Sequence, residues 1–313
     1  MIGLPALYSL AGLVFGSWAI ATLLDRQHGR RMMGAAFWGL LALEFLAGDA
    51  LGDMGNGLLL LALVGLALGG APGKGKTATA APAERAASVV RHGNRLFLPA
   101  LIMPGVALAG TLLFPRLGQL VDPKQVTLVS LGLGALVATA VLLLWLRPPA
   151  SAPVQEGRRL AEGVGWAMIL PQLLSSLGAL FTVAGVGEIV GALAPLAIPE
   201  GSRLAAVVAF TGGMAVFTML MGNAFAAFPV MMGGIGLPVL VLGMGASPVV
   251  VGAVGMLAGF CGTLLSPMAA NFNIVPAALL NLPDRYAVIR AQVATALPLW
   301  LFNTAMIWGF AFR

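Results

Sequence analysis

The stretch VTLVSLGLGALVATAVLLLWL at 126–146 contains no charged residue and decides the class of fold. It has about the 20 apolar residues that a helix needs to cross a hydrocarbon layer roughly 30 Å thick. The stretches LPALYSLAGLVFGSWAIATLL at 4–24 and LFLPALIMPGVALAGTLLF at 96–114 are similar in length and character. These blocks are apolar throughout rather than amphipathic, so each predicts a membrane-spanning helix.

The composition of the whole chain agrees with this prediction. Of its 313 residues, 59% are hydrophobic and 9% are charged, and the mean hydropathy is +0.98. Soluble domains contain about 25% charged residues. The sequence therefore predicts an all-α, polytopic helical membrane protein in the lipid bilayer, with about 9–10 hydrophobic segments. Regular spans are expected at 4–24, 32–51, 57–70, 96–114, 126–146, 166–198 and 289–312, and broken or re-entrant helices within 203–280.

The basic residues predict the orientation of the chain in the membrane. Eleven of the seventeen Lys and Arg residues lie in the connections 25–31, 71–95 and 147–163. The alternate connections, 52–56 and 115–125, contain only Arg116 and Lys124. Basic connections stay in the cytoplasm, so we expect the N-terminus to face outward. Because the basic residues form no single patch, a nucleic-acid partner is not expected.

The connection at 71–95 is rich in Ala, Pro, Gly and Thr and predicts a flexible cytoplasmic linker. It separates an N-terminal three-helix membrane segment at 1–70 from a C-terminal membrane transport region at 96–313. His28 and His92 lie in basic connections. Solvated histidines are therefore expected there.

Two apolar stretches contain polar residues and helix breakers, namely MGNAFAAFP at 221–229 and GTLLSPMAANFNIVP at 262–276. Non-helical backbone at membrane depth must be buried in protein or line a water-filled cavity. Transporters build substrate and ion sites from pairs of such discontinuous helices. The predicted substrate- or ion-binding residues are Asn223, Thr263, Ser266, Asn271 and Asn273. The predicted helix-breaking residues are Pro229, Pro267 and Pro276. The alternative is that the prolines kink the helices and the polar side chains hydrogen-bond between them.

Glu188 lies inside the apolar run 166–198, which is too long for one untilted span and is expected to bend or break. An ionisable residue inside a membrane span is costly and is commonly functional. Glu188 is therefore the predicted coupling acid for H⁺ or Na⁺. The alternative is a protonated or paired acid that holds two helices together.

No enzymatic activity, metal or cofactor is expected. The chain has one cysteine, Cys261, and contains neither an HExxH motif nor a GxSxG motif. Neither histidine lies in an apolar block, where it would have to be to activate a serine inside the membrane.

Three stretches resemble a family of bacterial inner-membrane permeases. They are MGNAFAAFPVMMGGIGLPVL (221–240), CGTLLSPMAANFNIVPAALL (261–280) and YAVIRAQ (286–292). Members of that family are typically encoded beside pyrrolidone-carboxylate peptidase and a smaller membrane protein. The resemblance implies transport of 5-oxoproline or a related compound, and it places Asn223, Pro229, Pro267, Asn271 and Asn273 in signature stretches.

These observations together predict a secondary-transporter-type permease for a small carboxylate, with 5-oxoproline as the candidate substrate. Coupling to H⁺ or Na⁺ and a smaller membrane-protein partner are expected. The alternative, from another class, is a non-transporting membrane subunit that scaffolds a partner permease.

Overall fold

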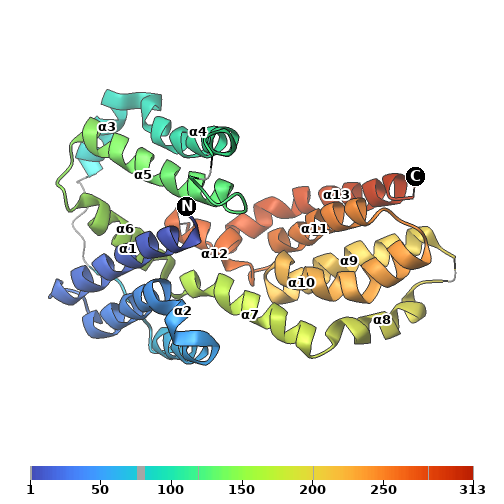
Figure 1. The fold of residues 1–313 in the computed structure, drawn as a ribbon. Coiled ribbons are helices and arrows are strands. Elements are labelled where there is room, and N and C mark those ends of the chain that lie inside the picture. The colour runs from blue at the N-terminus through green and yellow to red at the C-terminus, as the bar shows by residue number, and fades with distance from the viewer. Residues whose placement is uncertain (1, 76–81, 119, 200, 281, 313) are drawn as a thin grey trace. The chain divides into compact units, whose positions relative to one another are not determined.

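A computed structural model describes residues 2–75, 82–118, 120–199, 201–280 and 282–312. This part of the chain consists of helices and connections without a strand, and nine of its helices are long and apolar enough to cross a membrane (Figure 1). The predicted all-α polytopic membrane fold is thereby confirmed. The chain divides into two compact units, Met1–Gly165 and Trp166–Arg313, which are described separately.

The helices of the first unit belong to two groups separated by the 71–95 connection. The elements are α1 (Leu4–Leu24), α2 (Arg31–Leu68), α3 (Pro82–His92), η1 (Gly93–Phe97), α4 (Leu98–Leu113), η2 (Phe114–Arg116), α5 (Val126–Leu146) and α6 (Ala152–Val164). Helix α3 lies within the segment that is expected to be a flexible linker, so that segment is helical over this range. Residues 76–81 of the same segment lie outside the described residues.

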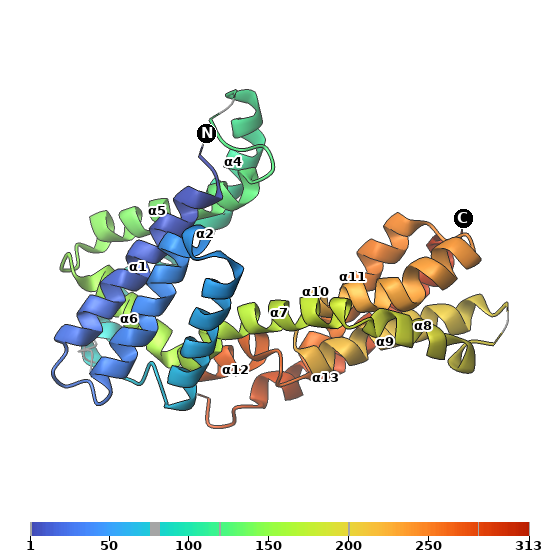
Figure 2. The same cartoon turned by 60° about the horizontal axis from the view of Figure 1, so that its bottom comes forward.

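Helix α2 consists of two arms that fold back on each other (Figure 2). Gly52 separates them, with a φ of 64° that favours glycine over residues with a side chain. The two ends of the element meet, because the Arg30 guanidinium donates a hydrogen bond to the Gly69 carbonyl. Near the bend, Asn56 Nδ2 donates to the Gly48 carbonyl at 2.9 Å. The arms therefore correspond to the two spans predicted at 32–51 and 57–70.

The second unit begins within the short turn η3 (Gly165–Ile169), and eight further described elements follow. These are α7 (Leu170–Val183), α8 (Val186–Ala197), α9 (Arg203–Met221), α10 and its π-helical continuation η4 (Ala224–Met231 and Met232–Gly243), α11 (Pro248–Leu265), α12 (Ala270–Leu279) and α13 (Ala287–Phe310). The long run at 166–198 is broken, as predicted. The break between α7 and α8 lies at Gly185, whose φ is 70°.

Helices α9 and α11 run parallel to each other and pack through glycines. Along α11, Gly255 faces the Phe210 ring and Gly262 faces the backbone of Ala215, so the contacts advance in the same direction on both helices. Small residues at such contacts let helix backbones approach closely in a membrane.

The segment α10–η4 instead runs back along α9. Here Gly213 faces Met231, whereas Gly236 faces Phe210, so the numbering advances in opposite directions. The core of this unit includes the fully buried Phe210, Met214 and Met231. Helices α9 and α10 thus form a hairpin, while α11 repeats the direction of α9.

Candidate functional site

The first break lies between α9 and α10 and consists of Gly222 and Asn223. Gly222 ends α9 in the left-handed conformation, with a φ of 70°. Asn223 then begins α10, because its Oδ1 accepts a hydrogen bond from the Phe225 amide at 2.9 Å. An asparagine at this position satisfies one of the amides that a helix start leaves unbonded. The chain therefore leaves the helix within MGNAFAAFP, at Gly222 and Asn223. The two helices that meet there, α9 and α10–η4, are each long and apolar enough to span a membrane, so this break is a turn between two candidate spans.

The second break lies between the end of α11 at Leu265 and the start of α12 at Ala270. It contacts the first break directly. Ser266 Oγ donates to the Met219 carbonyl at 2.6 Å and accepts from the Met268 amide at 3.1 Å. A Cβ atom on Gly222 would lie 2.5 Å from the Met268 carbonyl oxygen. We call the region where these two breaks meet, residues 219–225 and 263–273, the break crossing.

Asn273 is the most deeply buried polar residue of the break crossing, with 0% of its surface exposed. Its Nδ2 donates to the carbonyls of Thr263 and Ser266, both at 2.7 Å. These carbonyls belong to the end of α11, which has no following helical turn to bond them. The Asn273 amide therefore caps α11, while its Oδ1 atom is buried without a hydrogen-bond partner.

The other predicted binding residues differ in their surroundings. The Thr263 hydroxyl is buried and donates to the Phe260 carbonyl of its own helix at 2.6 Å. Asn271 is exposed, on the first turn of α12. The structure thus brings Asn223, Ser266 and Asn273 into the break crossing through side-chain hydrogen bonds.

Two of the three predicted helix-breaking prolines do not break a helix, which corrects the prediction for Pro229 and Pro276. Pro267 lies in the second break, but Pro229 lies inside α10 and Pro276 inside α12. A proline within a helix removes one backbone hydrogen bond without ending the helix in every case. The first break is formed instead by the conformation of Gly222.

Glu188 lies in the first turn of α8, directly after the break at Gly185, and its side chain is exposed. Helix α8 packs where α10 continues into η4: Gly187 approaches the Val230 carbonyl at the end of α10, and Gly191 approaches Gly234 in η4. The structure does not bring Glu188 into the break crossing. Its role as a coupling acid stays a prediction.

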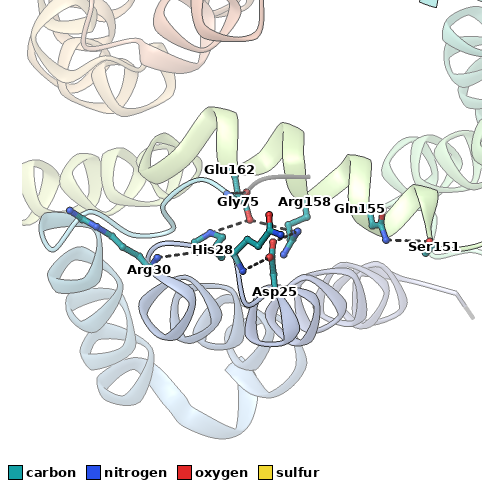
Figure 3. Close-up of polar contacts among 9 residues, drawn as sticks. Asp25, His28, Arg30, Gly75, Ser151, Gln155, Arg158 and Glu162 are labelled. Atoms are coloured by element: carbon teal, nitrogen blue, oxygen red, sulfur yellow. Dashed lines mark hydrogen bonds and ion pairs between the residues drawn. The ribbon is translucent and has the colours of Figure 1, made fainter. Parts of the chain in front are cut away.

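A second polar cluster, in the first unit, is not predicted from the sequence (Figure 3). Arg158 and Glu162 lie one turn apart on α6 and are 5% and 3% exposed. Arg158 Nη2 lies 2.9 Å from Asp25 Oδ2, and its Nε lies 3.6 Å from Glu162 Oε1. The Gly75 amide donates to Glu162 Oε2 at 2.7 Å. The cluster therefore joins the α1–α2 connection, the start of the 71–95 connection and α6.

The expectation that His28 is solvated is wrong, because this residue belongs to the cluster and is 3% exposed. Its Nδ1 accepts from the Arg30 amide at 3.2 Å, so a neutral ring carries its proton on Nε2. That atom lies 3.5 Å from Glu162 Oε1. Local composition cannot reveal this burial, because the covering helix α6 lies far along the chain. The pairing of Arg158 with Glu162 at i,i+4 is the one local signal.

The segment GAPGKGKT at 70–77 matches the letters of a phosphate-binding loop, GxxxxGK[ST]. Such a loop lies between a strand and a helix, whereas this segment follows helix α2. The Gly75 amide is bonded to Glu162, and residues 76 and 77 lie outside the described residues. The pattern therefore assigns no nucleotide site. Among the described residues, no group of three His, Cys, Asp or Glu side chains is placed to hold a metal ion.

The fold and the buried break crossing define the class of this molecule as a multi-pass helical membrane protein. A family model described as "Protein of unknown function (DUF979)" matches residues 5–312, so the chain belongs to this family. That description names neither a substrate nor a partner. No curated protein and no solved structure matches the chain.

Proposed function

We propose that this protein is a secondary-transporter-type permease for a small carboxylate, with 5-oxoproline as the first candidate substrate and H⁺ or Na⁺ as the coupling ion. It acts in the bacterial cytoplasmic membrane, with its N-terminus outside and with a smaller membrane protein as its partner. The proposal includes no enzymatic step. The observation that supports it is the contact between two buried helix breaks in the break crossing.

Helix breaks are costly inside a membrane-spanning unit, because each exposes backbone groups that must find partners. Here the first break is the turn of the α9–α10 hairpin, between two candidate spans, and the second is followed by the short helix α12. Two breaks that follow parallel helices and contact each other are the arrangement that transporters use for binding sites. Helix α12 begins at the crossing without a side-chain cap on its N-terminus, and amides at a helix N-terminus favour a carboxylate.

The alternative function is a non-transporting subunit that scaffolds a partner permease. The hydrogen bonds of Ser266 and Asn273 support it, because both side chains satisfy carbonyls at helix ends. A scaffold requires those bonds and no ligand. Transport measurements on the purified chain separate the two functions.

The experiment is uptake of labelled 5-oxoproline into proteoliposomes under an imposed proton or sodium gradient. It is measured for this chain alone and with its expected small membrane partner. We expect uptake that requires the gradient, and Asn223→Ala should reduce it at least about tenfold, corresponding to about 1.4 kcal/mol of lost interaction. Absence of uptake in every combination, with several small carboxylates, would favour the scaffold.

Two variants distinguish binding by Asn223 from its capping of α10. Asn223→Ser keeps a side-chain oxygen that can cap the helix but removes the amide. If Asn223 contacts the substrate, this variant should fold normally and still transport poorly. Asn303→Ala removes a buried amide of α13 that donates to Cys261 Sγ at 3.6 Å, and it should retain uptake. Normal uptake by Asn223→Ala would refute the site assignment.

A further inference from the structure

The Oδ1 atom of Asn273 is an acceptor without a donor inside the protein. The side-chain amide cannot rotate to exchange its two ends, because Nδ2 must face the carbonyls of Thr263 and Ser266. Oδ1 is therefore left as the free end of the amide, and it is buried without a hydrogen-bond partner. A buried polar atom without a partner is energetically unfavourable, so such atoms are normally hydrogen-bonded or bound to a ligand or water.

From the second residue of α9 to the end of α12, the chain contains no charged side chain that could be this partner. Helix α13 packs against α12, but the side chain of its Arg290 is 76% exposed and pairs with Asp284 at 3.1 Å. From 204 to 283 there is no Asp, Glu, His, Lys or Arg. Amides, hydroxyls and carbonyls are not protonated near neutral pH, so the break crossing itself cannot carry a coupling proton. The same oxygen atoms are, however, suitable ligands for a monovalent cation.

The break crossing offers a cation the C-terminal ends of two helices, and it offers a carboxylate the N-terminal ends of two others, α10 and α12. Helices α9 and α11 run parallel and both finish there, at Met221 and Leu265. The C-terminal end of a helix carries a partial negative charge of about half an elementary charge. Carbonyls that already accept one hydrogen bond, such as those of Ser266 and Met219, keep a second lone pair.

A cation would also solve the charge problem of the proposed substrate. A carboxylate moved into this region meets no Arg or Lys side chain between 204 and 283. An uncompensated charge buried in a medium of low dielectric constant is strongly unfavourable. A cation bound beside the carboxylate makes the pair neutral, and each then stabilises the other.

We infer that the break crossing binds a sodium ion, with Asn273 Oδ1 as one ligand, and that this ion is the coupling ion rather than H⁺. The inference rests on the proposed function for its link to transport, but the ion site itself does not depend on the substrate. Backbone carbonyls at the ends of α9 and α11 supply further ligands. Glu188, which the structure does not bring into the crossing, has no part in binding this ion.

The ion site is tested on the purified full chain in nanodiscs, with Na⁺ as the probe and without substrate. Thermal unfolding is measured as NaCl replaces choline chloride at constant ionic strength. A ligand that binds only the folded state raises the apparent unfolding temperature. We therefore expect the unfolding temperature to rise with the Na⁺ concentration and to reach a plateau. An unfolding temperature that does not respond to Na⁺ would overturn the inference and leave a buried water as the partner of Asn273.

Substitution of Asn273 tests whether its side chain is a ligand of the ion. Asn273→Ala also removes the cap on α11, so its unfolding temperature should fall even in choline chloride, and the informative quantity is the increment caused by Na⁺. We expect this increment to vanish or to need about tenfold more Na⁺, the factor for one lost contact. Asn303→Ala is the matched control and should keep the wild-type increment. A wild-type increment in Asn273→Ala would refute the assignment, and Glu188→Gln should behave like the wild type.

Uptake measurements separate failure of this inference from failure of the proposed function. Sodium-dependent stabilisation without uptake of any small carboxylate would keep the ion site and refute the transport proposal. Uptake of 5-oxoproline that proceeds equally in sodium-free choline medium would keep the transport proposal and refute sodium coupling. Stabilisation by Na⁺ together with uptake that requires a sodium gradient would support both.

Discussion

At the scale of single residues, Arg158 and Arg159 are adjacent on α6 but lie in different environments. Arg158 is buried between Asp25 and Glu162, with its side chain 6% exposed. Arg159 pairs with Glu156 on the surface, where the two side chains are 41% and 46% exposed. Buried and exposed ion pairs differ in energy, because an unpaired buried charge cannot be screened by water.

We predict that Arg158→Met destabilises the protein by about 3–5 kcal/mol, because it leaves the buried carboxylate of Glu162 and the partly buried one of Asp25 without their guanidinium. Arg159→Met removes only an exposed pair and should cost about 0.5 kcal/mol or less. Both free energies of unfolding are measured by denaturant titration of the detergent-solubilised chain. Equal effects of the two substitutions would show that the cluster around Arg158 is not buried in the folded protein.

At the scale of elements, the break between α9 and α10 depends on one glycine whose conformation and surroundings both exclude a side chain. Gly222 has a φ of 70°, and a Cβ atom there would lie 2.5 Å from the Met268 carbonyl. Gly245 has nearly the same φ, 72°, but no atom lies within 4 Å of a Cβ built on it. Substitution of Gly245 therefore tests backbone strain alone, whereas substitution of Gly222 tests backbone strain together with a steric clash.

We predict that Gly245→Ala lowers the free energy of unfolding by about 1–2 kcal/mol, because alanine is unfavourable in the left-handed conformation and meets no steric clash there. Gly222→Ala should lower the free energy of unfolding clearly more than Gly245→Ala does, because the added methyl group also forces the two breaks apart. Unfolding of both variants in detergent gives this comparison. The increment of the unfolding temperature caused by Na⁺ should be lost in Gly222→Ala and retained in Gly245→Ala. Equal costs for both variants would contradict the close contact of the two breaks.

The elements also show what sequence patterns can and cannot predict in this chain. Apolar length predicted the spans, because it is a local property of the sequence, whereas Gly222, which ends α9, was not among the predicted helix-breaking residues. Pro229 misled the prediction, since a helix can continue through a proline when neighbouring packing supports it. The burial of His28 depends on α6, more than a hundred residues later, and no local pattern contains that contact.

At the scale of the whole molecule, the connections of the first unit fall into two sets, each held together by contacts within the unit. The basic connections form one set and the sparsely basic connection 115–125 belongs to the other. The polar cluster joins the three basic connections, through Asp25, Gly75 and Arg158. At the N-terminus, the Ile2 amide donates to Leu120 at 2.8 Å, within the sparsely basic connection 115–125. Residues that touch one another must lie on the same side of a membrane. The alternation of basic and less basic connections therefore agrees with the contacts of the fold.

This agreement leads to a prediction about orientation. In a Cys261→Ser background, a cysteine at Gln27 should react with a membrane-impermeant thiol reagent only from the cytoplasmic side. A cysteine at Lys124 should react only from outside, because basic connections are retained in the cytoplasm. Both positions are exposed in the structure.

Labelling is compared in right-side-out and inside-out vesicles. The reverse pattern would keep the fold of the first unit but invert its orientation in the membrane. Labelling of both positions from the same side would contradict the number of crossings between them, since α1 and Ile2 tie these connections to opposite ends of one helix.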